Sequence, residues 1–270
     1  MPEVGPGWER DKRMHFDEIV GHYDKIRPEY PRELYADIFA YAGAGKNAIE
    51  IGPGTGKATR PFLDGGYNIT AIEIGANMTE FLQEKYKNYP NFSALTAAFE
   101  DAELAEEHFD LIYAATSFHW VDAEVGCPKA LRLLRSGGAI ALLRNNAMPG
   151  DGGEIYEAMQ TVYEKYYHKP YKRPVMKTKE DFNTHDGIYI SYRFKDLASY
   201  GFTDITMKFY DATRTFTADE YIALLDTFSD HRQLPESDRM ALYAGVKDAI
   251  LAHGGLHKVD YIYQLYMGRK

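Results

Sequence analysis

The sequence predicts an α/β fold built on a doubly wound, mostly parallel sheet. Apolar segments of strand length alternate with helical stretches from Asn47 to Arg144, which favours a parallel sheet with helices on both faces. The first segment runs into a glycine-rich turn, and the others run into polar or acidic residues. Open sheets of this kind bind ligands beyond the carboxyl ends of their strands. A ligand site is therefore expected at that end of the sheet.

The glycine-rich turn lies in residues 49–56, which read Ile-Glu-Ile-Gly-Pro-Gly-Thr-Gly. The first strand is expected to end at Ile51, and a helix is expected to begin near Lys57. Glycine permits positive φ and lets a ligand approach the backbone without meeting a Cβ atom. The turn is thus suited to hold a nucleotide-like ligand.

Two common nucleotide-binding turns do not fit this octet. A dinucleotide fingerprint would need its third glycine at position 57, where the chain has Lys57. A P-loop would need glycine at position 51 and Ser or Thr at position 58, where the chain has Ile51 and Ala58. The remaining pattern is Glu-x-Gly-x-Gly-x-Gly, with Glu50 two residues before Gly52.

The next two strands end close to acidic residues. The second strand, expected over residues 67–74, carries Glu73, which lies 21 residues after Gly52. A carboxylate about 20 residues after such a turn suits a ribose diol, because it can only accept hydrogen bonds. The third strand, expected over residues 92–97, runs into Ala-Phe-Glu-Asp at 98–101.

The fourth and fifth strands complete the parallel part of the predicted sheet. The fourth, over residues 109–115, runs into Ser-Phe-His-Trp-Val-Asp at 117–122. The fifth, over residues 138–144, follows Leu-Arg-Ser-Gly-Gly and runs into Asn145 and Asn146. Both carboxyl ends therefore bring polar side chains to the expected ligand site.

These segments together resemble class I S-adenosylmethionine-dependent methyltransferases over residues 15–145, and more weakly toward the C-terminus. The octet resembles motif I of that family, and the string at 117–122 resembles the branch that includes trans-aconitate methyltransferase-like proteins. Arg-Pro-x-Tyr-Pro at 27–31 resembles the segment before the first core helix of this branch. The resemblance implies a Rossmann-like fold and S-adenosyl-L-methionine as the cofactor. It also implies an antiparallel pair of C-terminal strands at one sheet edge.

The resemblance and the strand ends together predict the residues of a site. In the family, an acid after the third strand accepts from the adenine amino group; Glu100 is favoured for it, Asp101 is the alternative, and Phe99 contacts the ring. The predicted cofactor-binding residues are Glu50, Gly52, Pro53, Gly54, Gly56, Glu73, Ile74, Met78, Phe99, Glu100, Ser117 and Tyr23. The predicted substrate-binding residues are Arg27, Trp120, Arg144 and Asn145. His119 is the candidate catalytic base; the alternative is that His119 and Trp120 only shape the wall of the site.

Four regions are expected along the chain. Residues 1–45 form an N-terminal segment over the site, with a helix over 31–41, and residues 46–147 form the cofactor-binding core. Residues 148–200 form a helical cap insertion, whose first helix carries Ile155, Met159, Val162 and Tyr166 on one face and ends at Pro170 and Pro174. Residues 201–270 hold the last two strands, over 203–210 and 261–267. Two helices are inserted between these strands: one starts at the capping box Thr217–Glu220 and runs to about 228, and the other covers 235–253.

Composition limits the class of protein. The formal net charge is −9 and the isoelectric point about 5.5, which argues against general nucleic-acid binding but leaves room for RNA at a local basic patch. One cysteine, the lack of an apolar run of bilayer length and the lack of a signal-peptide core predict a cytoplasmic protein. No ligand spacing indicates a metal site. The expected partner is a small-molecule substrate rather than nucleic acid or membrane, and the chain is expected to be a monomer or homodimer.

A basic stretch without acids lies between Glu164 and Glu180. Its charged residues are Lys165, Lys169, Lys172, Arg173, Lys177 and Lys179. It is either a solvated helix face or a surface that attracts an anionic or aromatic acceptor.

Four functions compete. The leading hypothesis is methyl transfer to a small molecule, with a carboxylate as one candidate acceptor. The alternatives are an RNA or protein methyltransferase, which would need a broad basic groove or an added recognition domain, and a cofactor-binding protein without transferase activity. An NAD-dependent oxidoreductase is disfavoured because Lys57 stands where the third glycine belongs.

Overall fold

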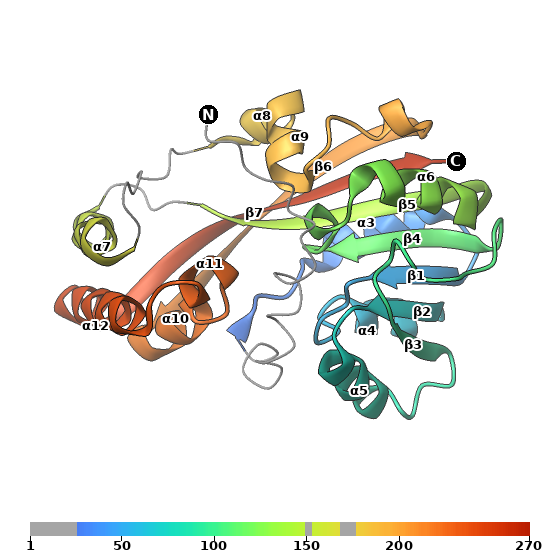
Figure 1. Cartoon of the computed structure of the whole chain (residues 1–270). Coiled ribbons are helices and arrows are strands. Elements are labelled where there is room, and N and C mark those ends of the chain that lie inside the picture. Colours follow the sequence, from blue (N-terminus) through green and yellow to red (C-terminus); the bar gives the residue numbers. More distant parts are fainter. Residues whose placement is uncertain (1–25, 149–152, 168–176) are drawn as a thin grey trace.

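The computed structural model describes residues 26–148, 153–167 and 177–270, and it contains one seven-stranded sheet (Figure 1). The strand order is β3-β2-β1-β4-β5-β7-β6. Strands β1 to β5 are parallel, and β7 runs antiparallel between β5 and β6. The strands are β1 (Asn47–Ile51), β2 (Asn68–Glu73), β3 (Phe92–Thr96), β4 (Phe109–Ala115), β5 (Leu134–Ala147), β6 (Thr203–Thr217) and β7 (Leu256–Arg269). The predicted mostly parallel sheet with an antiparallel C-terminal pair is confirmed.

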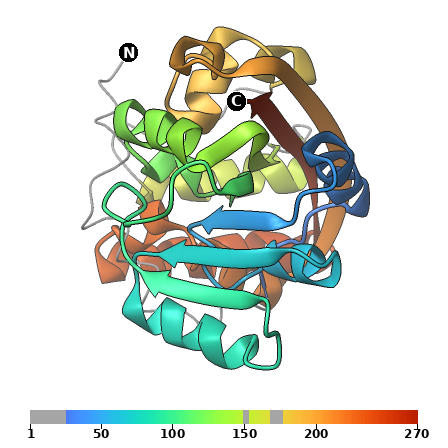
Figure 2. The ribbon, with the colours of Figure 1, turned by 90° about the vertical axis from the view of Figure 1, so that its right-hand side faces the viewer.

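Helices cover both faces of the sheet because successive strand residues point to opposite sides. Leu111 and Tyr113 of β4 pack with helices α3 and α4 on one face, whereas Ile112 and Ala114 pack with α6 and α9 on the other. Figure 2 shows β1, β2 and β3 side by side, with α5 next to the edge strand β3. The helices of the core are α3 (Arg32–Ala42), α4 (Thr59–Asp64), α5 (Ala76–Lys85), the 3₁₀ turn η2 (Phe118–Trp120) and α6 (Ala123–Leu133). The later ones are α7 (Glu154–Tyr166), α8 (Lys179–Phe182), α9 (His185–Tyr192), the 3₁₀ turn η3 (Ala198–Tyr200), α10 (Ala218–Leu225), α11 (Ser229–Arg232) and α12 (Glu236–Ala252).

The last two strands are about twice as long as predicted. Strand β6 continues to Thr217 and β7 begins at Leu256, and the two stay paired over this whole extension. Figure 1 shows β5, β6 and β7 extending past the ends of β1 to β4 toward α10 and α12. These long strands connect the core sheet to a separate group of helices.

That group, called the cap here, consists of α7, α10, α11 and α12. Its interior is apolar: Met159 of α7 packs with Leu225 of α10 and with Leu242 and Val246 of α12. The predicted capping box is present, since Thr217 accepts from the Glu220 backbone and the Glu220 carboxylate accepts from the Thr217 backbone N–H at 2.8 Å.

Several predicted boundaries were wrong. Helix α10 ends at Leu225 rather than near residue 228, and the separate helix α11 follows it. Helix α4 begins at Thr59 rather than near Lys57. The insertion holds α8 and α9, which periodicity did not indicate. The predicted stop of α7 at Pro170 and Pro174 lies outside the described residues.

None of the helices described combines the length and the apolar composition needed to cross a membrane.

Candidate functional site

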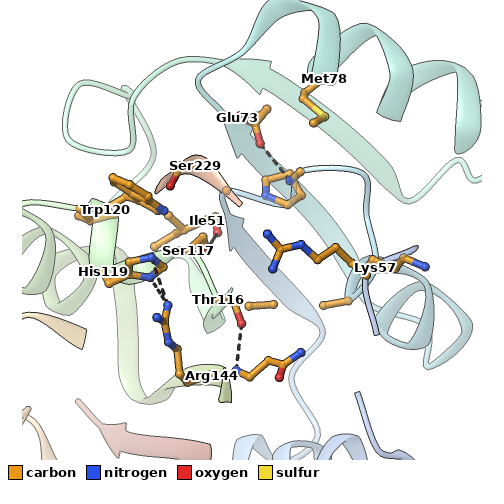
Figure 3. A pocket seen from close by; sticks show the side chains of 18 of the residues that line it. Ile51, Lys57, Glu73, Met78, Thr116, Ser117, His119, Trp120, Arg144 and Ser229 are labelled. Carbon is orange, nitrogen blue, oxygen red and sulfur yellow. Dashed lines mark hydrogen bonds between the residues drawn. The ribbon is translucent and has the colours of Figure 1, made fainter. Parts of the chain in front are cut away.

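A cavity of about 360 Å³ lies at the carboxyl ends of β1, β2, β4 and β5 (Figure 3). Its wall also includes Arg27, Pro28 and Tyr30 and, from the cap, Leu224, Phe228, Ser229 and Asp230. Pockets for small ligands measure roughly 300–1,000 Å³, so this one suits a small molecule. The expected position of the ligand, beyond the strand ends, therefore coincides with a cavity.

The glycine-rich turn forms the floor of the cavity and is open on the ligand side. Gly52 and Gly54 both lie in the cavity wall and have φ of 60° and 57°. A Cβ atom at Gly52 would come within 2.7 Å of the Ser117 Cβ atom, whereas one at Gly54 would meet no protein atom within 4 Å. Gly52 is therefore needed for packing, and Gly54 leaves space that a ligand can fill.

Glu73 ties the turn to the second strand. It is 7% exposed, and its two oxygens accept from the backbone N–H groups of Gly54 (3.0 Å) and Gly75 (3.1 Å). A carboxylate offers about four acceptor positions. Glu73 also lines the cavity, so the carboxylate that holds the turn faces the expected position of the ribose diol.

An apolar slot continues from Glu73. Ile74, Met78, Phe99 and Val121 line it, and all except Ile74 are buried. Such a slot suits a flat heteroaromatic ring. Glu100 is not in the cavity wall; its Oε1 accepts from the backbone N–H of Asp122 at 3.0 Å and so holds the loop that carries Val121.

Two other predicted cofactor residues, Glu50 and Gly56, lie behind the turn and not in the cavity wall. Glu50 is fully buried behind the turn, where its Oε2 accepts from the hydroxyls of Thr59 (2.7 Å) and Tyr113 (2.9 Å). Burial raises the pKa of Glu50 to about 7. Gly56 is also behind the turn, since a Cβ there would come within 2.8 Å of the Tyr86 ring. Tyr23 lies outside the described residues. Pro53 and Ser117 do line the cavity.

The predicted substrate residues Arg27, Trp120, Arg144 and Asn145, together with His119, all line this same cavity. Arg144 and His119 are in direct contact: Nη1 of Arg144 lies 2.7 Å from Nδ1 of His119 and 3.1 Å from Nε2 (Figure 3). Burial, together with the positive charges of Arg144 and Arg193, lowers the pKa of His119 well below its usual value. His119 is therefore neutral at pH 7, and the nitrogen that could take a proton is engaged by Arg144.

Arg144 has no acidic partner among the residues that the structure describes. Its Nε is buried without a hydrogen-bond partner in that set. Burial lowers the pKa of its guanidinium, and the charges of Arg193 and Arg27 act in the same direction. A guanidinium without a counterion is costly to bury. This end of the cavity is thus chemically suited to an anion.

Thr116 is a site residue that the sequence did not indicate. Its φ is 55°, which is rare for a β-branched residue and typical of strained functional positions. Its Oγ1 lies 2.6 Å from the Tyr30 hydroxyl and accepts from the Asn145 backbone N–H at 3.1 Å. The threonine thereby joins β5 to the N-terminal segment. No sequence signal reveals this backbone angle, but Tyr30 belongs to the Arg-Pro-x-Tyr-Pro string.

The N-terminal segment also contacts the cap. Arg27 Nη2 donates to the Thr227 carbonyl at 2.8 Å, and the guanidinium carbon lies 4.5 Å from the centre of the Phe228 ring. Sequence reasoning missed Phe228, Ser229 and Asp230 because α11 has only four residues and no periodicity.

The basic stretch is only partly within the described residues. Lys169, Lys172 and Arg173 fall outside them, and none of Lys165, Lys177 and Lys179 lines the cavity. Lys179 pairs with Asp211, and Lys165 lies over the Tyr166 ring. The described part is therefore a surface feature away from the cavity wall.

Comparisons with known proteins bear on this site. Residues 49–142 match the family model of a methyltransferase domain. An uncharacterized methyltransferase of Mycobacterium bovis is 31% identical over 136 residues, which make up 50% of this chain and 54% of the relative. The chain thus matches about half the length of the first such relatives.

Solved structures share the fold. A candidate type II methyltransferase from Anaeromyxobacter dehalogenans has a TM-score of 0.62 at 18% identity, covering 90% of this chain and 97% of the other. Phosphoethanolamine N-methyltransferase 2 of Haemonchus contortus, bound to S-adenosylhomocysteine, has a TM-score of 0.53 at 15% identity, covering 100% of this chain and 61% of the other. The [4+2]-cyclase SpnF has a TM-score of 0.54 at 15% identity, covering 97% of this chain and 96% of the other. Residues 49–142 are thus similar to a methyltransferase domain, the relatives are named methyltransferases, and the solved structures share the Rossmann-like fold.

Proposed function

We propose that this chain is a class I methyltransferase that moves a methyl group from S-adenosylmethionine to a small-molecule carboxylate. The observation that carries the acceptor class is Arg144, a guanidinium in the cavity wall without an acidic partner among the described residues. The open turn at Gly54, the carboxylate of Glu73 and the apolar slot at Phe99 fit the cofactor. The string at 117–122 favours the branch that includes trans-aconitate methyltransferase-like proteins.

Each group of residues has a distinct role in the proposed methyl transfer. Bound S-adenosylmethionine supplies an activated methyl group on a sulfonium. Glu73 and the turn hold the cofactor, Arg144 orients the acceptor carboxylate, and the cap excludes water. Holding two reactants in line can supply about 7–11 kcal/mol of a barrier. A carboxylate nucleophile carries no proton to remove, which agrees with a neutral His119 engaged by Arg144.

Two alternatives are kept. A cofactor-binding protein without transferase activity is favoured by the shared fold of the cyclase SpnF, since one fold can host unrelated chemistry. An RNA or protein methyltransferase is disfavoured by the net charge of −9. We therefore infer a small-molecule partner, no nucleic acid or membrane partner, and a monomer or homodimer. A cytoplasmic location stays a prediction that rests on the sequence.

The proposal is tested in two steps. The melting temperature is first measured with S-adenosylmethionine, S-adenosylhomocysteine or NAD; a ligand at about 100 times its Kd stabilises by about 2.7 kcal/mol. Transfer of labelled methyl groups is then measured against carboxylates, phenols and amines. Stabilisation by NAD alone would exclude the methyltransferase. Cofactor binding without transfer to any acceptor class would favour the non-transferase alternative.

The role of Arg144 is tested with Arg144→Ala, and Arg132→Ala on the exposed face of α6 is the control. Loss of one charge-assisted contact costs about 2 kcal/mol, so acceptor kcat/KM should fall roughly thirtyfold with cofactor affinity unchanged. Equal turnover by both variants would exclude Arg144 as the anion contact, and a neutral preferred acceptor would exclude the carboxylate.

A further inference from the structure

The cap brings an acidic side chain into the wall of the same cavity. Ser229 and Asp230 of α11 both line it, and the Asp230 side chain is 55% exposed. In the view of Figure 3, Ser229 is drawn beside Trp120 and above His119, and Arg144 is drawn below His119. The cavity therefore has a cationic group from the core and an anionic group from the cap.

Asp230 is held in place by side chains of α7 and α11. Its Oδ1 lies 3.2 Å from Nδ1 of His231, and its Oδ2 accepts from the Tyr167 hydroxyl. Nε2 of the buried His231 lies 2.9 Å from the Tyr163 hydroxyl. A proton on Nδ1 of His231 can be donated to Asp230, while the Tyr163 hydroxyl lies within hydrogen-bond distance of Nε2. Such a chain fixes the direction in which the carboxylate points.

The chemistry of Asp230 selects its role. Burial raises its pKa, but the hydrogen bond and charge of His231 and the Tyr167 hydroxyl outweigh this and hold the pKa at about 2. So acidic a group is a poor general base at neutral pH. The Tyr167 hydroxyl and the ring and backbone N–H groups of His231 use three of about four acceptor positions on the carboxylate, so it can still accept a hydrogen bond from a ligand.

We propose that Asp230 binds a hydroxyl or ammonium group of the acceptor, and that His231, Tyr163 and Tyr167 are positioning residues for it. This inference rests on the proposed function and narrows it. The acceptor is then a carboxylate that also carries a hydrogen-bond donor, with the carboxylate at Arg144 and the donor at Asp230. A carboxylate acceptor that lacks a hydroxyl or ammonium group would make no contact with Asp230.

The test uses binding to the protein saturated with S-adenosylhomocysteine, measured by calorimetry. The first three probes are succinate, malate and aspartate, which differ only in carrying hydrogen, hydroxyl or ammonium at one carbon. The other three are the five-carbon diacids with the same substituents: glutarate, 2-hydroxyglutarate and glutamate. The wild type should bind a donor-bearing acid at least tenfold more tightly than the plain one. A preference for malate over aspartate assigns a hydroxyl, and the reverse assigns an ammonium.

Variants separate the possible outcomes. The quantity compared is the ratio of the affinity for the donor-bearing acid to the affinity for the unsubstituted acid. Asp230→Ala should bring this ratio to within about threefold of unity, and Tyr167→Phe should reduce it. The control Asp248→Ala, on the exposed surface of α12, should preserve the ratio. The inference is overturned if no probe binds, if the plain acid binds as tightly as the others, or if Asp230→Ala leaves the ratio unchanged. It is also overturned if Asp230→Ala weakens S-adenosylhomocysteine binding, which would make Asp230 a cofactor contact. If the unsubstituted diacids bind to the wild type and Arg144→Ala abolishes that binding, the proposed function remains intact even when the inference about Asp230 fails.

Discussion

The guanidinium of Arg144 is bonded to the ring of His119, with Nη1 at 2.7 Å from Nδ1, although the two residues are 25 positions apart. They meet because Arg144 is near the end of β5 and His119 follows β4, and these strands are parallel neighbours. A neutral imidazole has one nitrogen that accepts. Because Arg144 engages that nitrogen, His119 orients the arginine and does not take a proton from the acceptor.

The first prediction concerns His119→Asn. Loss of a general base typically costs about 10²–10⁴-fold in rate. We expect a fall in kcat of less than about tenfold, since the asparagine oxygen can still accept from Arg144. The change should appear mainly in the acceptor KM, measured by steady-state methyl transfer.

The pH dependence of kcat/KM provides a second test of the role of His119. Wild type and His119→Asn should have profiles of kcat/KM with the same shape between pH 6 and 9. A loss of 100-fold or more in kcat, together with the disappearance of a titration step in that range, would restore His119 as the base.

The second prediction concerns the buried carboxyl of Glu50. Its pKa is about 7 in the folded chain and 4.5 as the ordinary value. Between these values the unfolded chain has released the proton while the folded chain holds it, so stability falls as pH rises. At about 1.4 kcal/mol per pKa unit, the loss of unfolding free energy from pH 4.5 to 7 is about 3 kcal/mol.

Glu50→Gln should remove this dependence. The amide oxygen can accept from Thr59 and Tyr113, and the amide nitrogen would take the place of Oε1, which is buried without a partner among the described residues. Urea unfolding at pH 5 and pH 7.5 should show the variant gaining stability over wild type only at the higher pH. Glu106→Gln, at an exposed carboxylate, is the control. A variant less stable at pH 7.5 would mean that Glu50 is ionised in the folded protein.

Much of the site could be predicted because its residues follow strands in a fixed order. The apolar run of β4 ends at Ala115 as expected, so the side chains that follow it had to lie at the carboxyl edge. Arg144 lies near the end of the next strand of the sheet, so it was expected at the same edge, but its contact with His119 was not predicted. These inferences need only periodicity and the parallel arrangement of the sheet.

The remainder depends on information that is not local in the sequence. Glu50 stands beside the turn in sequence, but its side chain points behind the turn, because Thr59 and Tyr113 supply donors there. Asp230 belongs to a four-residue helix that exists because the cap packs around His231. The charged residues Asp211 and Arg214 obscured the length of β6, which is set by pairing with β7.

The third prediction concerns Glu73→Gln. Gly54 and Gly75 donate to different oxygens of Glu73, and a glutamine has only one acceptor oxygen, so one of these two bonds must be lost, along with a charge-assisted contact to the ribose. We expect at least a tenfold loss of affinity for S-adenosylmethionine by calorimetry. The two backbone bonds also predict a loss of about 1–3 kcal/mol in unfolding free energy, which the sequence alone did not indicate. Unchanged affinity would exclude Glu73 from the ribose site.

The fourth prediction compares two glycines with the same strain and different surroundings. Gly54 and Gly66 have φ of 57° and 78°, and a Cβ at either would meet no protein atom within 4 Å. Gly54 lines the cavity, whereas Gly66 lies in the exposed turn before β2. Alanine at either position is forced into the left-handed region, at about 1–2 kcal/mol of unfolding free energy. Both variants should therefore lose similar stability in urea.

Only Gly54→Ala should lose the cofactor, because only there would the new methyl group occupy space against the ligand. We expect a fall in S-adenosylmethionine affinity of more than tenfold for Gly54→Ala and of less than twofold for Gly66→Ala. Measuring both quantities on both variants separates backbone strain from ligand exclusion. If Gly54→Ala binds the cofactor as tightly as Gly66→Ala does, the cofactor does not approach the turn at Gly54, and the placement of its methionine portion over the turn is wrong.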